Sequence, residues 1–364
     1  MTTTDDLALQ WDDFCDQLKS AGRLISADNT PAAVFDRAEG YRYLTRLLRA
    51  GLESQIESSN SSFPRFFQLA NETIKIGNDN PDNIYHNANI DGSMDYRVWG
   101  TRGSVHYLSF GTKAGSYETT GTMEHSGHLD IEDIDVNDDG TFEIIISSSE
   151  KAGNWLPMQE QTKSLIVRQT FNDRAAEVPA QYHIECLNPR QTDTLCPDEF
   201  AKRLAASAGF VSSTAGLFIS WMNQYAAHIN QLPYDDQTKC QRAGGDSNIQ
   251  YLQSYWRLAD DEALVIHAKD IPECTTWNFQ LSNYWMESLD YRHHTVSFNQ
   301  HTAQTEADGS VMLVVSARQP ASRYSNWIET CGHNEGGMLW RWVGADTSRE
   351  YPVDCQVRPA SDLM

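Results

Sequence analysis

The first part of the chain carries apolar residues at helical spacing. One set near the start recurs at intervals of three and four residues: Leu7, Trp11, Phe14 and Leu18. This spacing predicts an amphipathic helix within residues 1–30. Thr30-Pro31 predicts the start of a second helix, because a capping threonine followed by proline is a common helix start. Apolar residues then predict a shorter helix over 63–76.

From about residue 78 the pattern changes to short alternating or β-branched runs separated by turn residues. Strands are predicted at 95–99, 104–110, 141–148, 164–171 and 182–186. Helical spacing returns at 197–208 and 214–230. A second series of strands is predicted at 263–268, 276–282, 296–299, 311–316 and 338–343.

The order of these elements is helices, strands, helices, strands. It predicts an α+β protein of two related halves, each a helical segment followed by a mainly antiparallel β-sandwich or jelly-roll-like sheet. Antiparallel pairing is favoured because the strands are joined by short connections. We expect an N-terminal helix at 1–30, a first half at 31–190 and a second half at 191–364.

A long motif occurs twice and supports this division. Asp139-Gly140 opens a predicted strand and leads to Asn154-Trp155 and Arg168; 169 residues later, Asp308-Gly309 leads in the same way to Asn326-Trp327 and Arg341. Each copy predicts a tight turn, a buried strand, a loop closed by Asn-Trp, and a returning strand that carries the arginine. Self-similarity of this kind indicates an internal duplication.

Composition narrows the classes of partner. The chain has 28 basic and 50 acidic residues and a net charge of −22, which disfavours nucleic acid and anionic membranes. No run approaches 18 apolar residues, and the start lacks the pattern of a signal peptide. Seven scattered cysteines fit a reducing compartment, so we expect a cytoplasmic protein. The apolar Trp11 on the first helix leaves self-association into a homo-oligomer open.

Several ordered motifs of the second half resemble a bacterial family known as domain of unknown function 1214, which often occurs with domain of unknown function 1254. They are Trp285-Met286-Glu287-Ser288-Leu289-Asp290, Asp308-Gly309-Ser310, Asn326-Trp327, Gly332-His333 and Arg341-Trp342. The resemblance is clearest from 262 to 345. The first half keeps Met123-Glu124, Asp139-Gly140, Asn154-Trp155 and Arg168. The resemblance implies a β-sandwich or jelly-roll-like domain with attached helices, and no activity. Many relatives look exported, so location is not carried over.

The repeated Asn-Trp and Arg residues have two interpretations. Asn326 and Arg341 can donate hydrogen bonds to a carboxylate or phosphate, with Trp327 as a platform for the ligand. Alternatively, the asparagine ties its loop to the backbone while the tryptophan covers the sheet core. Their presence in both halves favours the structural interpretation.

Titratable residues gather in segments that the two halves do not share. The candidates for catalysis are Glu287, Asp290, Tyr291, His293, His294 and His333. A carboxylate beside a histidine is a workable acid/base pair. Trp285, Glu124 and His125 join Arg341, Asn326 and Trp327 as candidates for substrate binding. The alternative is that these segments are polar, solvated loops.

Metal and cofactor chemistry find little support. His125 and His128 are three residues apart, and other histidines and carboxylates are available, but no recognised ligand spacing such as H-E-x-x-H occurs. Glycine-rich phosphate-binding motifs are also missing. We therefore expect no metal and no cofactor.

Together these features favour a metal-independent enzyme of the lyase, dehydratase or hydrolase type. Its substrate would be a small, partly apolar, hydroxylated metabolite held in a cleft between the halves. The alternative is a non-catalytic protein that binds a glycan or lipid-like ligand, or acts as a scaffold.

Overall fold

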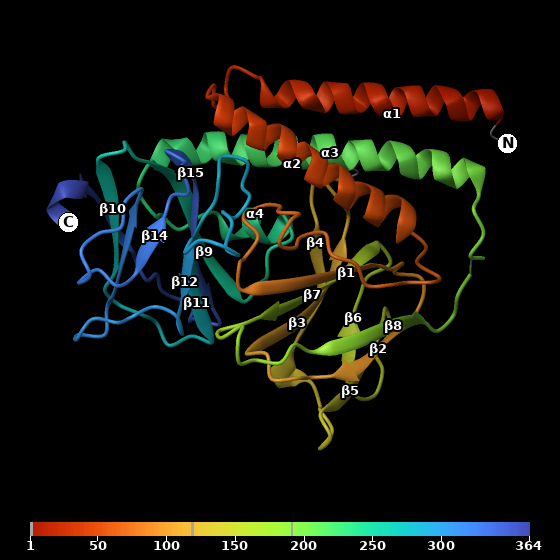
Figure 1. The fold of residues 1–364 in the computed structure, drawn as a ribbon. Helices are drawn as coiled ribbons and strands as arrows, with labels where there is room; N and C mark the ends of the chain where they lie inside the picture. Colours follow the sequence, from red (N-terminus) through yellow and green to blue (C-terminus); the bar gives the residue numbers. More distant parts are fainter. Residues whose placement is uncertain (1–2, 118–119, 191) are drawn as a thin grey trace.

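The computed structural model describes residues 3–117, 120–190 and 192–364. Figure 1 shows two β-sandwiches side by side, with long helices lying across one side of both. The helices are α1 (Thr4–Ile25), α2 (Val34–Leu52, extended by a π-helical turn at Glu53–Glu57), α3 (Pro197–Tyr225) and the short α4 (Gln237–Arg242). A buried apolar cluster between α1, α2 and α3 holds this helical layer together.

The first half is a sandwich of two four-stranded sheets, ordered β1-β7-β3-β4 and β6-β5-β2-β8. Its strands are β1 (Asn83–Asn89), β2 (Tyr96–Thr101), β3 (Tyr107–Ala114), β4 (Glu124–Asp130), β5 (Thr141–Ser147), β6 (Trp155–Pro157), β7 (Thr162–Thr170) and β8 (Gln181–Cys186). Side chains from both sheets, such as Phe110 and Ile144, share one core. All pairs are antiparallel except β5 with β6.

The second half repeats this sandwich strand for strand. Its sheets are ordered β9-β15-β11-β12 and β14-β13-β10-β16. The strands are β9 (Ile249–Arg257), β10 (Glu262–Ala268), β11 (Thr276–Leu281), β12 (Ser297–Asn299), β13 (Val311–Ser316), β14 (Trp327–Glu329), β15 (Glu335–Val343) and β16 (Asp354–Pro359). Each of β1 to β8 therefore has its counterpart in β9 to β16, and the single parallel pair, β13 with β14, is repeated as well. The predicted α+β architecture of two related, mainly antiparallel halves is confirmed.

One sheet of each half faces the other half. In the second half this inner sheet contains β9, which is buried at every position except its last. One face of β9 packs in the sandwich core through Leu252 and Trp256, while Ile249 and Tyr251 contact Tyr107 of the first half. Strands covered on both faces are continuously buried, whereas β16 at the edge of the outer sheet is largely exposed.

Several local predictions are wrong. Residues 63–76 form no helix; the segment is irregular and pairs through a single bridge between Phe67 and Asn87. The helices predicted at 197–208 and 214–230 are one helix, α3. The second helix begins at Val34 instead of Pro31. Residues 1 and 191, where two of the predicted segments begin, lie outside the described residues.

Helix α3 has a further property. Together with the turn that follows it, Pro197–His228, it is long and apolar enough to cross a membrane by length and composition alone. A core helix of a soluble protein meets the same test, and more than half of the apolar part of α3 is buried inside this fold. The expected absence of a membrane partner stays a prediction.

Candidate functional site

A cavity of about 170 Å³ lies between the two halves. Equivalent residues of the two inner sheets line it in pairs: Tyr85 and Tyr251, Asn87 and Gln253, Ile166 and Leu339, Arg168 and Arg341. The strand register confirms the equivalence, since Tyr85 pairs with Arg168 on β1 and β7, and Tyr251 with Arg341 on β9 and β15. The duplicated arginines thus meet in one place.

Helix α3 and the segment before β1 cover the cavity with apolar side chains. Phe210, Phe218 and Trp221 of α3 line it together with Leu69 and Ile76. The cavity therefore joins a polar part built from the two inner sheets to an apolar part built largely from α3. This combination suits a ligand with a polar head and an apolar body.

Each arginine reaches across to a loop of the other half. The Arg168 guanidinium donates to the carbonyl oxygen of Gly244, and that of Arg341 donates to the carbonyl oxygen of Asn78. Both acceptors have positive φ, 96° and 58° respectively, which is rare for a residue other than glycine. Each loop thus has a positive φ at the residue that accepts the arginine, and the crossed bonds link the two halves.

An equivalent tyrosine in each half, Tyr85 or Tyr251, accepts a hydrogen bond from the loop of that half. The backbone N–H of Asn80 donates to the Tyr85 hydroxyl at 3.0 Å, and that of Asp246 donates to the Tyr251 hydroxyl at 2.9 Å. Asn80 and Asp246 are therefore equivalent positions that carry different charges. This difference makes the surroundings of the two arginines unequal.

Arg168 has an ionic partner and Arg341 has none within ion-pair distance among the described residues. Arg168 lies 3.6 Å from the Asp246 carboxylate, which is fully buried. Arg341 is 5% exposed and donates only to neutral oxygens, including Gln280 Oε1 at 2.6 Å. Burial lowers the pKa of Arg341, and the Tyr85 and Tyr251 hydroxyls oppose this. The Asp79 and Asp82 carboxylates also oppose it, from beyond ion-pair distance.

A buried network of charges surrounds Asp246. Burial would raise the pKa of Asp246, but Arg168, His128 and neighbouring donors hold it below its ordinary value. Burial lowers the pKa of Lys113 to about 7, and its Nζ donates to the carbonyl oxygen of Gly245 at 3.0 Å. His125, opposite Lys113 on β4, has its pKa lowered to about 4 by burial and by Lys113.

A second cavity, of about 200 Å³, lies beneath α2 and is called the α2 cavity here. It brings together four of the predicted catalytic residues, Glu287, Asp290, His294 and His333. His333 Nε2 lies 2.6 Å from Oε2 of Glu39 on α2, and Glu287 Oε1 lies 2.5 Å from Arg46 Nη1. The Asn283 amide donates to both carboxylates, at 3.2 and 3.0 Å.

Opposing effects set the charges of these groups. Burial alone would lower the pKa of His333, but Glu39 raises it above its ordinary value. The pKa of Glu39 is lowered because His333 and Arg42 outweigh burial. Burial raises the pKa of Glu287 in spite of Arg46. The Glu39–His333 contact is thus a buried ion pair that extends through Asn283 to Glu287.

Asp290 and His294 line this cavity but have other partners, and Tyr291 and His293 are not among its lining residues. Asp290 pairs with Arg292 at 2.7 Å, which together with hydrogen bonding lowers its pKa. The Tyr291 ring lies under Lys75 Nζ at 4.5 Å. His293 is exposed, and His294 contacts Glu329.

The predicted substrate-binding residues are spread over several places. Asn326 donates to the carbonyl oxygens of Gln304 and Met312, and Trp327 Nε1 to that of Ser316 at 3.2 Å. The first half repeats these bonds through Asn154 and Trp155. Neither Asn326 nor Trp327 lines either cavity.

None of the remaining three predicted residues lines either cavity. Trp285 is buried against α2 and donates to the carbonyl oxygen of Asp36 at 2.8 Å. Glu124, at the start of β4, pairs with Arg242 at 3.1 Å. His125 lies on the same strand, so the alternative of a solvated loop is wrong for this segment.

Sequence reasoning overlooked Arg168, Tyr85, Tyr251, Asn80 and Glu39 as site residues. The signal for Arg168 was present, because the duplicated motif contains it together with Arg341. The tyrosines and Asn80 carry no such signal, since the strand pairing alone reveals their equivalence. Glu39 lies on a helix far from His333 in the sequence.

Comparison with known proteins supports the duplicated architecture. The model of the family described as protein of unknown function DUF1214 matches residues 111–170 and 257–346, which run from β3 to β7 and from β10 to β15. The crystal structure of an uncharacterized protein from Burkholderia cenocepacia is 46% identical, with a TM-score of 0.94, over 97% of this chain and 98% of that one.

A more distant similarity concerns the fold alone. The VPA0106 protein from Vibrio parahaemolyticus is 10% identical, with a TM-score of 0.51, over 86% of this chain and 97% of that one. The search of curated proteins returned no significant match. The two matched segments and the full-length relative show that this chain belongs to the DUF1214 family of proteins of unknown function.

Proposed function

We propose that the protein binds a small monocarboxylate with an apolar body in the cavity between its halves. The observation that carries the proposal is Arg341, a buried cation whose hydrogen-bond partners are all neutral. No carboxylate lies within ion-pair distance of Arg341 among the described residues, and Asp79 and Asp82 act on it only from farther away. A buried charge without a close partner is costly, and a carboxylate matches the planar fork of a guanidinium. The equivalent position in the first half already has its carboxylate, Asp246.

Volume and charge support a ligand of limited size. A cavity of about 170 Å³ is close to the roughly 150 Å³ of an engineered protein cavity that accepts benzene. Asp79 also lines the cavity, so a dianion such as phosphate would meet a nearby acidic group. A monoanion with about one ring or a short chain of apolar atoms therefore fits best.

Calorimetric titration with benzoate and benzamide tests this proposal, because the two probes share a ring and differ in charge. The wild-type protein should bind benzoate at least about tenfold more tightly, a difference of about 1.4 kcal/mol. Arg341→Met should abolish this preference, while Arg358→Met on exposed β16 should keep it. Equal binding of both probes, or an unchanged preference in Arg341→Met, would refute carboxylate binding by Arg341.

Acid/base catalysis is a second candidate, favoured by the Glu39–His333 contact of 2.6 Å in the α2 cavity. His333 Nδ1 also contacts the carbonyl oxygen of Thr330 at 3.0 Å, so both ring nitrogens have partners. Neither ring nitrogen is free to exchange a proton with a substrate in this arrangement, and we therefore rank catalysis below binding. A turnover screen of hydroxylated metabolites by mass spectrometry, comparing wild type with Glu39→Gln, tests it. A product formed at the same rate by both proteins removes Glu39 from the mechanism.

We also propose a cellular location and a class of partner for the protein, both from its sequence. The net charge of −22 supports a small-molecule ligand over nucleic acid or an anionic membrane surface. Cytoplasmic residence and self-association rest on the cysteine pattern and the exposed Trp11 respectively.

A further inference from the structure

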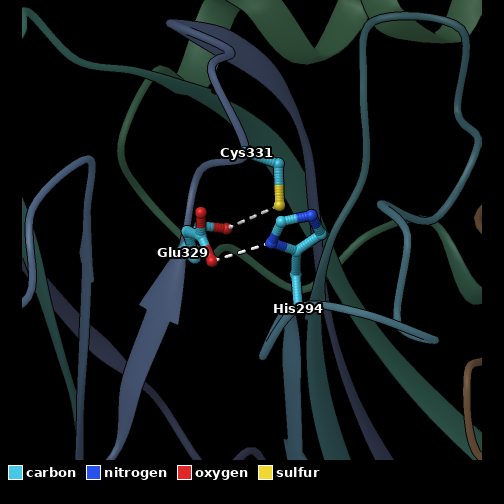
Figure 2. Close-up of side chains that lie close together, drawn as sticks. All are labelled: His294, Glu329 and Cys331. Carbon is cyan, nitrogen blue, oxygen red and sulfur yellow. Dashed lines mark hydrogen bonds and ion pairs between the residues drawn. The ribbon is translucent and has the colours of Figure 1, made fainter.

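Three potential metal ligands meet on the surface of the second half. Figure 2 shows the side chains of His294, Glu329 and Cys331 directed toward one another. His294 Nδ1 lies 2.9 Å from Glu329 Oε2, and one ligand atom of each residue lies within 4.8 Å of the others. The three come from two segments that are far apart in the sequence.

Backbone hydrogen bonds hold these segments together. Glu329 ends β14, and its N–H donates to the carbonyl oxygen of Thr295 at 2.8 Å, which places the neighbouring His294 beside the strand. Cys331 follows two residues after Glu329, at a positive φ of 54°. The arrangement is therefore fixed by the fold and does not depend on the side-chain contacts alone.

Among its described residues, the first half has no counterpart of this cluster. Aligning β6 with β14 places Pro157 opposite Glu329 and Gln159 opposite Cys331. Neither residue is a customary ligand for a transition metal. The three ligands are therefore specific to the second half. A structural role that both halves share does not explain them.

We propose that His294, Glu329 and Cys331 bind a divalent transition metal ion of the zinc type. Imidazole, carboxylate and thiolate are the three ligand types that Zn²⁺ uses, whereas the harder Mg²⁺ and Ca²⁺ prefer oxygen alone. In a tetrahedral site with bonds of about 2.0–2.3 Å, ligand atoms lie roughly 3.5 Å apart. Small rotations of these partly exposed side chains bring them to that spacing.

The proposed ion faces the α2 cavity. His294 and Cys331 both line that cavity of about 200 Å³, so the fourth coordination position is open to water or a small ligand. Three protein ligands with one open position is the arrangement of reactive zinc sites, whereas purely structural sites have four protein ligands. This site lies outside the cavity between the halves, and its proposal does not rest on carboxylate binding there.

Cobalt(II) is a suitable probe, because a thiolate bound to it gives a charge-transfer absorption in the near ultraviolet. The full-length protein, treated with a chelator and then titrated with Co²⁺, should bind one equivalent with this absorption, and Zn²⁺ should displace it. Cys331→Ser should lose the absorption, while Cys274→Ser, also half-buried in the second half, should keep it.

A histidine pair provides a second control. His294→Asn should weaken Co²⁺ binding by about tenfold or more, because loss of even an outer-shell partner of a metal ligand costs about 10–100-fold in affinity. His301→Asn, at another surface loop of the same half, should leave binding unchanged. Absence of the absorption in the wild type, or its persistence in Cys331→Ser, would overturn the proposal. Thermal unfolding in chelator, expected to be equal for all variants, separates metal loss from misfolding.

Discussion

Arg168 and Arg341 occupy the same place in the two copies of the fold, but only Arg168 has a carboxylate within ion-pair distance among the described residues. The difference comes from Asp246 in one loop and Asn80 in the equivalent loop. The sequence shows both arginines, and strand pairing is needed to see which residues face them. Reasoning from the sequence named Arg341, and not Arg168, among the binding candidates, while it favoured a structural role for the repeated motif in both halves.

The two arginines should respond differently to removal. Arg168→Met leaves the buried Asp246 without its main partner, so the free energy of unfolding should fall by about 3–5 kcal/mol. Arg341→Met leaves only neutral acceptors unsatisfied and should cost about 1–3 kcal/mol. Urea unfolding of both variants measures this, and a larger loss for Arg341→Met would mean that Arg341 has an ionic role in the free protein.

His125 should make stability depend on pH. Burial and Lys113 lower its pKa to about 4, against roughly 6.5 in the unfolded chain. The unfolded state therefore binds more protons at this site between these values, and the contribution of His125 to the free energy of unfolding should fall as pH drops from about 6.5 to 4. Arg168, His128 and Asp246 also face this imidazole.

Urea unfolding of His125→Gln across this pH range tests the assignment. The slope should become shallower and should not vanish, because burial also lowers the pKa of His86. An unchanged slope would show that His125 does not control it.

At the scale of elements, α2 packs closely against Trp285 because residue 40 is a glycine. A Cβ added at Gly40 would lie 2.5 Å from the Trp285 ring, while one added at Gly216 of α3 would meet nothing within 4 Å. Alanine favours a helix by about 1 kcal/mol over glycine. Gly216→Ala should therefore raise the free energy of unfolding by up to about 1 kcal/mol, and Gly40→Ala should lower it.

Thermal and urea unfolding of the two glycine variants provide the comparison. Stabilisation by both substitutions would mean that α2 moves away from Trp285 at little cost. In that case the α2 cavity, which α2 covers, would be less rigid than its contacts indicate.

The Asn-Trp loops test the structural interpretation of the duplicated motif. Asn326 is buried and makes three hydrogen bonds with the backbone at Gln304 and Met312. Asn326→Ala should lower the free energy of unfolding by about 2–3 kcal/mol. Benzoate affinity, extrapolated to the fully folded protein, should stay the same. A loss of affinity without a loss of stability would instead assign Asn326 to ligand binding.

Strands whose apolar or β-branched runs are bounded by turn residues, such as β13, were predictable in both the outer and the inner sheets, whereas the short outer strands β6 and β14 were not predicted. The inner strand β9 was not recognised as one, because it is buried on both faces and mixes tyrosine, glutamine and serine. The segment 63–76 was wrongly predicted as a helix. There the Asn71 side chain accepts from the N–H groups of Thr73 and Ile74, which favours a turn over a helix.

At the scale of the whole molecule, the two equivalent inner sheets of the duplicated fold face each other (Figure 1). Helix α3 covers the cavity between them. The two crossed loops fasten the halves, and each half completes the surroundings of the other half's arginine. A sequence pattern predicts the halves but not the space between them. The site therefore emerged from the duplicated residues as well as from those that the halves do not share.

A crystal structure with bound 4-bromobenzoate tests the central claim most directly, because anomalous scattering locates the bromine. We expect the bromine beside Phe218 and Trp221 in the cavity between the halves, with a carboxylate oxygen about 2.7–3.0 Å from the Arg341 guanidinium. Bromine density only outside this cavity, or a carboxylate directed away from Arg341, would contradict the account.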